Sequence, residues 1–373
     1  MAGGSGANFT YTGQEMPYDR WAGSVGIPIH RGHGVEDLRT VALGRWEERG
    51  CDAAFVRLEG QEGVCESRVT EIAPGAALPA GRFAIDELVY VLSGHGATTV
   101  WSGNGPKKVF EWQPHSLFAV PRYAWRQFAN LQGDTPARLL HYNYLPLAMT
   151  AAPEPELFFH PSVDRPEMLY GSEFYSAATM VESPDASEGR GLSQVWIGNF
   201  FPDMRAWDKV EANTGRGAGG SIVRMGFPGS ELTTHMSVFA ARTYKKAHRH
   251  GPGRLIVIPS GVGYSVMWRE GGEKVVVPWH ECSVLVPPDR WFHQHFNAGG
   301  EPARYLALHP PRQFGGHAEK IEDRARDQIE YPDEDPWIRQ RFEEELAGRG
   351  LRSLMPERAY RDRAWEWRPG DPL

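Results

Sequence analysis

Two histidines stand one residue apart at the start of the stretch 247–261, directly before an apolar, β-branched run. On a β-strand, residues two apart point to the same side, so His248 and His250 would project together. A third histidine, His293, follows in the run PDRWFHQHFN. Imidazole nitrogens are common ligands of divalent transition metals, so three of them on two strands predict a metal site. A lone pair of this kind would equally fit histidines that only fill space on a strand.

The sequence also contains an internal repeat, which bears on that alternative. Residues of rare or conformationally special types recur at an offset of 167 without a gap. The matching pairs are Gly94 and Gly261, Gly96 and Gly263, Trp101 and Trp268, Trp112 and Trp279, Pro121 and Pro288, and Asn130 and Asn297. Agreement at so many tryptophans and glycines in one register indicates a duplicated domain.

The first copy lacks all three histidines. Their positions are occupied by Gly81, Phe83 and Arg126, while Glu87 and Gly75 remain at the equivalents of Arg254 and Arg242. Glycine and phenylalanine cannot ligate a metal, so the first copy is predicted to be metal-free and structural. Because the three histidines are present together in one copy and absent together from the other, the ligand interpretation is favoured over space filling.

The elements that must position these residues are short strands. Apolar, β-branched and aromatic segments separated by Gly, Pro and Asn clusters predict antiparallel strands in a barrel or sandwich. They lie at 68–75, 87–101, 116–121, 137–146, 235–243, 254–268, 274–280, 282–288 and 303–309. A helix is expected over 334–350, with Pro336 in its first turn. Its predicted apolar stripe, which would cover a sheet edge, comprises Trp337, Ile338, Phe342 and Leu346.

The repeated segments match two known motifs. In the second copy, His248, His250 and Gly261 fit the pattern G-x5-H-x-H-x3-4-E-x6-G. The positions that fit G-x5-P-x-G-x2-H-x3-N are Pro288, His293 and Asn297. Both copies, over roughly 55–145 and 225–312, therefore resemble cupin domains. Four positions of the second copy depart from the motifs, namely Arg242, Cys282 and Arg290 for glycines and Arg254 for the glutamate.

This resemblance implies an all-β fold of two double-stranded β-helix (jelly-roll) barrels in tandem with a C-terminal helix. The expected domains are a metal-free cupin over 1–150, a linker with the first strands of the second domain over 151–224, a metal-binding cupin over 225–312, and a C-terminal extension over 313–373.

Three neutral imidazoles would leave open coordination positions on a metal ion. The runs AHRHGPGRLIVIPSGVGYSV and WFHQHFN are similar to those of gentisate-type ring-cleaving dioxygenases, which are also bicupins but carry the metal in the first copy. The resemblance implies Fe(II), with Mn, Ni, Cu and Zn left open. It implies a dioxygenase that uses O2 to cleave a C–C bond in a small aromatic or hydroxylated organic acid. The alternatives are a redox-neutral metal enzyme (lyase, decarboxylase or isomerase) at the same site, or a non-catalytic small-molecule-binding bicupin.

Three further residues enter the predicted site. His295 shares a strand face with His293 and is predicted to be catalytic, through hydrogen bonding or proton transfer beside the ligands. It would otherwise be a fourth ligand, or a histidine satisfied by a backbone carbonyl. Arg254 is predicted to bind the substrate carboxylate, unless it swings out to a surface acid. Tyr264 is predicted to line the substrate pocket with neighbouring aromatic residues, which otherwise pack in the core. His235, His280 and His309 have no motif position.

Composition narrows the partners. The net charge is -7 and the basic residues are scattered, which argues against nucleic acid. Three cysteines without a CxxC pair suggest a reducing compartment. The sequence shows neither a secretory leader nor a long apolar run, so a cytoplasmic protein without a membrane partner is expected. The expected partner is a small acidic molecule, and a homo-oligomer is expected because paired cupins commonly assemble.

Overall fold

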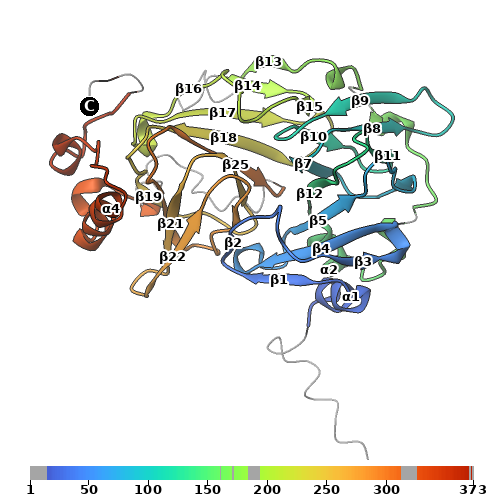
Figure 1. The fold of residues 1–373 in the computed structure, drawn as a ribbon, viewed down its shortest axis with the longest axis horizontal. Helices are drawn as coiled ribbons and strands as arrows, with labels where there is room; N and C mark the ends of the chain where they lie inside the picture. The colour runs from blue at the N-terminus through green and yellow to red at the C-terminus, as the bar shows by residue number, and fades with distance from the viewer. Residues whose placement is uncertain are drawn as a thin grey trace, which may run out of the picture.

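The computed structural model describes residues 15–159, 161–169, 172–183, 194–311, 326–368 and 371. These residues form two β-barrels side by side along the long axis of the molecule (Figure 1). Each barrel has one large and one small sheet, and the strands within each sheet pair mainly in antiparallel fashion. The expected all-β architecture of two jelly-roll barrels with a C-terminal helix is confirmed.

The first barrel is built from the N-terminal part of the chain and one strand from beyond it. Its large sheet runs in the order β1-β4-β5-β12-β7-β10-β15, with β3 beside β4, and its small sheet in the order β6-β11-β8-β9. The strands are β1 (Ile29–Gly32), β3 (Gly44–Trp46), β4 (Cys51–Leu58), β5 (Glu66–Ile72), β6 (Gly81–Arg82), β7 (Glu87–Ser93), β8 (Gly96–Trp101), β9 (Lys108–Trp112), β10 (Leu117–Val120), β11 (Trp125–Asn130), β12 (Ala137–Asn143) and β15 (Phe200–Phe201).

The second barrel repeats this plan. Its large sheet runs β13-β14-β17-β18-β25-β20-β23-β2, with β16 beside β17, and its small sheet runs β22-β21-β24-β19-β26. The strands are β2 (Gly34–Val35), β13 (Thr179–Glu182), β14 (Gln194–Ile197), β16 (Glu211–Ala212), β17 (Ser221–Gly226), β18 (Thr233–Phe239), β19 (Ala247–His248), β20 (Leu255–Ser260), β21 (Gly263–Trp268), β22 (Lys274–Trp279), β23 (Val284–Leu285), β24 (Phe292–Asn297), β25 (Ala303–His309) and β26 (Gln328–Ile329).

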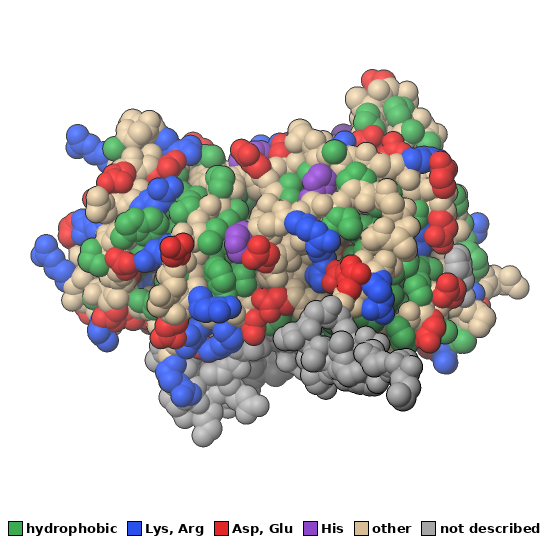
Figure 2. All heavy atoms as spheres, turned by 90° about the horizontal axis from the view of Figure 1, so that it is seen from below, with side chains coloured by type: hydrophobic (Ala, Val, Ile, Leu, Met, Phe, Trp, Pro, Cys, Tyr) green, Lys and Arg blue, Asp and Glu red, His purple; other side chains and the backbone are tan. Residues whose placement is uncertain are grey.

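Helices are few and lie outside the barrels. The α-helices are α1 (Pro17–Val25), α2 (Leu145–Ala151), α3 (Glu156–Phe159) and α4 (Pro336–Gly348). The 3-10 helices are η2 (Glu47–Arg49), η3 (Glu59–Gln61), η4 (Pro166–Leu169), η5 (Ser172–Tyr175), η7 (Thr214–Arg216), η10 (Tyr331–Asp333) and η11 (Glu357–Tyr360). Within the described ranges, no helix is both long and apolar enough to cross a membrane. On the face shown in Figure 2, basic and acidic side chains are interspersed.

The duplication extends to individual hydrogen bonds. In the first barrel the indole nitrogen of Trp112 donates to Thr98 Oγ1 at 3.0 Å. In the second, Trp279 donates to Ser265 Oγ at 3.1 Å, at positions offset by the same 167 residues. Each bond ties two neighbouring strands of the small sheet together from inside the protein, so the two copies share side-chain contacts as well as topology.

The second copy has other residues at three glycine positions of the motifs, and the backbone there keeps the left-handed conformation that glycine favours. Arg242, Cys282 and Arg290 all have positive φ, at 57°, 65° and 59°. A left-handed conformation costs a residue with a Cβ about 1–2 kcal/mol. The equivalent residues of the first barrel, Gly75, His115 and Tyr123, are also left-handed. The turn shape is therefore kept in both copies whether or not glycine is present.

The two barrels exchange strands. β2, from the start of the chain, pairs with β23 of the second barrel through Gly34–Leu285 and Val35–Val284. β15, which falls in the expected linker, pairs with β10 of the first barrel. One cluster of buried apolar side chains runs through both barrels, from Leu38 to Leu308. The large sheets of the two barrels thus share a continuous core.

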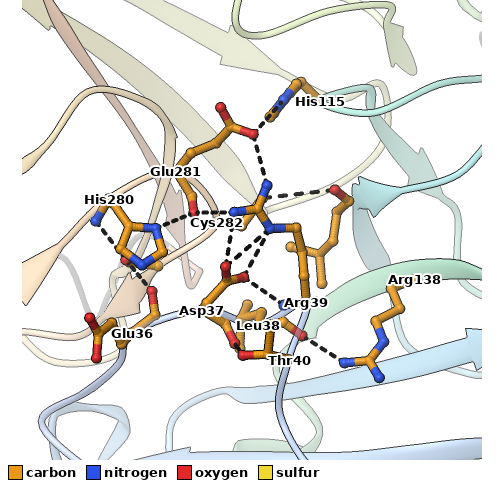
Figure 3. Close-up of polar contacts among 12 residues, drawn as sticks. Glu36, Asp37, Leu38, Arg39, Thr40, His115, Arg138, His280, Glu281 and Cys282 are labelled. Carbon is orange, nitrogen blue, oxygen red and sulfur yellow. Dashed lines mark hydrogen bonds and ion pairs between the residues drawn. The ribbon is translucent and has the colours of Figure 1, made fainter.

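A polar network joins the barrels where β2 ends (Figure 3). Arg39 pairs with Asp37 and reaches Glu281 of the second barrel, with Nη1 to Oε1 at 3.0 Å. Glu281 also lies 3.6 Å from Nε2 of His115 in the first barrel. The backbone carbonyl of Cys282 accepts a hydrogen bond from the backbone N–H of Leu38 at 3.1 Å. Because residues 115 and 282 are equivalent in the repeat, the same turn of each barrel faces the other across the junction.

The C-terminal segment packs on the small sheet of the second barrel, at the far end of the molecule (Figure 1). Asp335 caps α4 by accepting from the backbone N–H of Trp337 at 3.0 Å. The predicted stripe is buried at Ile338, Phe342 and Leu346. Trp337 departs from the prediction, since its side chain is 37% exposed. Adjacent helical residues are about 100° apart, so Trp337 cannot share the face of Ile338.

A buried carboxyl joins this segment to the barrel. Glu334 accepts a hydrogen bond from the hydroxyl of Tyr244 and one from Gln294 Nε2 at 3.2 Å. Burial raises the pKa of Glu334 from 4.5 to about 7. The unfolded chain releases this proton at lower pH than the folded one, so the associated stabilisation is complete below pH 4.5 and lost as the pH rises through 7.

We therefore expect Glu334 to lower the free energy of unfolding by about 2 kcal/mol between pH 5 and pH 8. In urea unfolding at these two pH values, Glu334→Gln should remove most of this loss, because a neutral amide has no proton to release. Glu343→Gln on the exposed face of α4 is the matched control. Equal pH dependence in the wild type and Glu334→Gln would contradict the prediction.

Candidate metal centre

The three predicted ligand histidines converge inside the second barrel. His248 lies in β19 and is the direct cross-strand partner of His293 in β24. His250 follows β19 by two residues. The ring centroid of His293 lies 4.3 Å from that of His248 and 4.6 Å from that of His250. The potential ligand nitrogens all lie within 4.8 Å of one another. Among the described residues, this is the one group of three such side chains that meets.

The histidines are oriented as ligands need to be. Nδ1 of His250 lies 2.7 Å from the carbonyl of Gly251, and Nδ1 of His293 lies 3.2 Å from that of Trp291. A ring that donates from Nδ1 keeps the lone pair of Nε2 for a metal. Nε2 of His293 and Nδ1 of His248 are buried without a hydrogen-bond partner among the described residues. Burial lowers the pKa of His293 to about 3, so the ring is neutral, as ligation requires. The donor set fits a divalent transition metal.

His295 lies beside this cluster and is held by a side chain. Its ring centroid is 5.6 Å from that of His293 and 4.8 Å from that of Tyr305. Its Nδ1 lies 2.8 Å from Ser265 Oγ, which itself accepts from the indole of Trp279. When the Ser265 hydroxyl donates to Nδ1, the proton of the neutral His295 ring is on Nε2. The partner is a hydroxyl and not the backbone carbonyl considered from the sequence.

Arg254 is buried in the second barrel, with 8% of its surface exposed. Burial, followed by the charge of Arg216, lowers its pKa to about 10. Arg254 in turn contributes to the lowered pKa values of His293 and His235. The alternative in which Arg254 swings out to the protein surface is therefore wrong, and its charge acts on the histidine cluster.

Tyr264 does not reach the cluster. Its strand partner is Phe296, whereas the adjacent pair is Ser265 and His295. Alternation along β21 therefore turns Tyr264 to the opposite face, where it stacks on Phe296 at 4.6 Å and packs among the residues that contact α4. The prediction that Tyr264 lines the substrate pocket is corrected on this ground. Trp268 stacks on Phe292 at 5.8 Å on the same outer face.

The sequence analysis missed two basic residues near the cluster. Lys245 is almost completely buried, and its Nζ donates to Ser237 Oγ. Its charge contributes to the lowered pKa of His295. Arg216, in η7, hydrogen-bonds Gln328 of β26 at 2.8 Å and is the largest charge contribution to the lowered pKa of His248. No motif marks either residue, because each is brought in from outside the repeated strands.

A histidine pair on the large sheet was also unassigned. Nδ1 of His235 lies 2.8 Å from Nε2 of His309, and both rings lie on neighbouring strands β18 and β25. The repeat could have drawn attention to His235, because its counterpart at an offset of 167 is Arg68, a buried charged residue of the first barrel. His280 lies away from the cluster, at the junction of the two barrels (Figure 3).

Comparison with known proteins finds similar structures but no similar sequence. No family model matches this chain, and no curated protein matches its sequence. The chain is similar to the formate complex of Lactobacillus farciminis oxalate decarboxylase, with a TM-score of 0.49 and 14% identity over 76% of this chain and 87% of that one. It is similar to Bacillus subtilis oxalate decarboxylase, studied for its Mn(II) centres, with a TM-score of 0.48 and 14% identity over 77% of this chain and 78% of that one. The fold itself, two jelly-roll barrels in tandem, is given by the strand order of the described residues.

The bicupin fold does not decide the reaction. The finer resemblance to gentisate-type dioxygenases is not shown by these comparisons, and neither is ferrous iron. What the cluster can do follows from its own residues. Three imidazoles meet in the second barrel, and the charges of Arg216 and Arg254 lower the pKa values of His248 and His293. This arrangement suits a metal ion and an anionic ligand together.

Proposed function

We propose that the second barrel binds one divalent transition metal through His248, His250 and His293, and that the protein is an enzyme that breaks a C–C bond in a small carboxylic acid. The observation that carries the proposal is the convergence of three buried imidazoles, with the charge of Arg254 acting on His293. Neither the ligands nor Arg254 compensate a divalent charge, so an anionic substrate complements both.

The bound metal supplies a Lewis acid and a template with open coordination positions. Histidine ligation suits several divalent ions, and we take Mn(II) and Fe(II) as the two to test first. The protein groups hold the substrate. Arg254 pairs with its carboxylate, and burial of the cluster keeps water from the reacting atoms.

Redox-neutral decarboxylation is the reaction that these residues support best. Loss of CO2 leaves an electron pair on carbon that must take up a proton. His295 lies beside the ligands and delivers this proton from Nε2 in the tautomer whose Nδ1 accepts from Ser265. Lys245 lies next to His295 and is the nearby residue from which that proton is replaced. A reaction of this type consumes no oxygen.

Dioxygen-dependent ring cleavage is the second candidate. It is favoured by the ligand set itself, which contains three histidines and no carboxylate, as in the gentisate-type motifs HRH and WFHQHFN. In that reaction both oxygen atoms enter the product, and His295 serves in hydrogen bonding to the substrate.

One experiment separates the two reactions and the non-catalytic alternative. Metal content is measured on purified protein, which is then loaded with Mn(II) or Fe(II) and given a panel of small acids that includes oxalate, 2-hydroxy acids and gentisate. CO2 release and O2 uptake are followed together. CO2 without O2 uptake supports decarboxylation, and stoichiometric O2 uptake supports ring cleavage. A binding protein would show neither CO2 release nor O2 uptake. Purified protein without stoichiometric metal would contradict the proposal as a whole.

The role of Arg254 is tested separately. Arg254→Gln should raise KM for the acid about 10- to 100-fold, because a charge-assisted hydrogen bond to a carboxylate contributes about 1.5–3 kcal/mol. Metal content should not change, since Arg254 is not a ligand. Arg358→Gln, which removes an exposed arginine from η11, is the control. An unchanged KM in Arg254→Gln would reject the substrate-binding role.

A further inference from the structure

The first barrel contains a cavity where the second has its histidines. The cavity has a volume of about 60 Å³, and its walls include Gly81 and Arg126, the counterparts of His248 and His293. A Cβ added to Gly81 would meet no atom within 4 Å. The glycine at the position of His248 therefore leaves space in the first barrel. Some 10–15 Å³ holds one water molecule, so about four to six non-hydrogen atoms fit.

The cavity is lined by charged groups that are deeply buried. Arg68 bonds the carboxylates of Glu66 and Glu87, and none of the three is more than 7% exposed. Arg126 is 7% exposed, and Arg49 stands nearer the rim, over the ring of Phe159. The set contains three guanidinium groups and two carboxylates. The four deeply buried groups are balanced, with Arg68 and Arg126 against Glu66 and Glu87, and the half-buried Arg49 adds a positive charge near the rim. Since Arg68 bonds both carboxylates, Arg126 is the buried cation that an anionic ligand can pair with.

Three of these groups have a polar atom without a well-aligned hydrogen bond among the described residues, namely Nη1 of Arg126, Oε2 of Glu87 and Oε2 of Glu66. Arg126 and Glu87 line the cavity, and Glu66 does not. Oε2 of Glu87 pairs with Nδ1 of His141 at 3.1 Å and lies 3.8 Å from Nη2 of Arg126, so it has room for one further donor. A buried guanidinium needs an acceptor and a buried carboxylate needs a donor. One ligand that offers both satisfies the two atoms together.

The ligand has a route to the cavity. Pro79, which lines it, is exposed, and Leu78, Gly81 and Arg49 are half-buried. This barrel offers no cluster of metal ligands among the described residues, so recognition rests on the charged side chains alone.

We propose that the first barrel binds one small carboxylate monoanion in this cavity, with Arg126 holding the carboxylate and Glu87 accepting from a hydroxyl group of the ligand. Glycolate and bicarbonate have this chemistry, whereas acetate offers the carboxylate alone. The site is independent of the metal in the second barrel, so the two proposals stand or fall separately.

The test uses full-length protein stripped of metal by a chelator. Glycolate, bicarbonate and acetate are titrated by calorimetry, with chloride as the anion control. We expect one saturable site per chain, with glycolate bound more tightly than acetate. Arg126→Gln should weaken binding about tenfold or more, because it removes a charge-assisted hydrogen bond. Arg358→Gln, which removes an exposed arginine of η11, should leave it unchanged.

A second variant guards against misfolding of the first. Gly81→Leu fills the cavity from a position where a side chain meets open space, and it leaves Arg126 in place. It should abolish binding while the circular dichroism spectrum and melting temperature stay near those of the wild type. Absence of saturable binding to the stripped wild-type protein would overturn the proposal, and so would binding that survives both Arg126→Gln and Gly81→Leu. Binding lost only in Arg254→Gln would place the anion in the second barrel and overturn it equally.

Discussion

His293→Ala should reduce bound metal from about one ion per chain to almost none and lower kcat/KM at least 100-fold. His293 is the histidine whose ring lies within 4.6 Å of both other candidate ligands, so its loss breaks the cluster at its centre. Loss of a group that only supports a ligand already costs about 10- to 100-fold in affinity, and loss of the ligand itself costs more. The measurement is elemental analysis of the purified variant together with the assay of the wild type.

His295→Phe provides the matched comparison. Phenylalanine stands at the equivalent position of the first barrel, as Phe128, so we expect the second barrel to accommodate it at position 295. This variant should keep its metal and lose activity, because His295 is held by Ser265 beside the ligands and is not one of them. Loss of metal in His295→Phe would instead make His295 a ligand. Full metal content in His293→Ala would remove the basis of the proposed enzyme.

Gly263→Ala should lower the free energy of unfolding by about 3 kcal/mol or more, the scale of a severe steric change in a packed core. A Cβ at this position would lie 1.9 Å from the carbonyl oxygen of Phe296 and 2.7 Å from the ring of Trp279. The backbone of β24 and the indole must both move. Because Trp279 bonds Ser265, which holds His295, the variant should also lose activity before it unfolds.

The repeat supplies an internal check on this prediction. Gly96 has the same surroundings, with an added Cβ 2.2 Å from both the carbonyl of Ala129 and the ring of Trp112. Gly96→Ala should therefore destabilise to a similar extent without affecting the metal site directly. Gly300→Ala, where an added Cβ meets nothing within 4 Å, is the control. The measurement is denaturant unfolding of the three variants. Equal free energies of unfolding for Gly263→Ala and Gly300→Ala would contradict the prediction, because the strands would then have moved apart without loss of stability.

Much of the architecture was predictable because it depends on local patterns that repeat. Strand segments follow from alternation and turn residues, and the offset of 167 identifies the second barrel from the first. The grouping of His248, His250 and His293 follows from the two-residue period of a strand and from motif spacing. The same period, applied to Tyr264, would have placed it on the face away from His295, since the two strands pair at Ser265.

Other parts of the site depend on contacts between segments far apart in the chain. Arg216 reaches the histidines from a 3-10 helix, and Lys245 precedes the short strand β19, so strand periodicity applies to neither. The charged cavity of the first barrel needs Arg68 and His141 from two different strands, and their pairing in register cannot be obtained from composition. The exchange of β2 and β15 is likewise decided by packing between the barrels and has no local signal.

The exchanged strands constrain how the chain is made and divided. β2 leaves the ribosome early but has to wait for β23, which is synthesised near the end, before its backbone amides find partners. A gene cut between the two repeats would give fragments that each expose an unpaired sheet edge, a surface that favours aggregation. We therefore expect the two copies to fold as one unit, in which the side chains of each barrel can differ while both barrels stay in one chain.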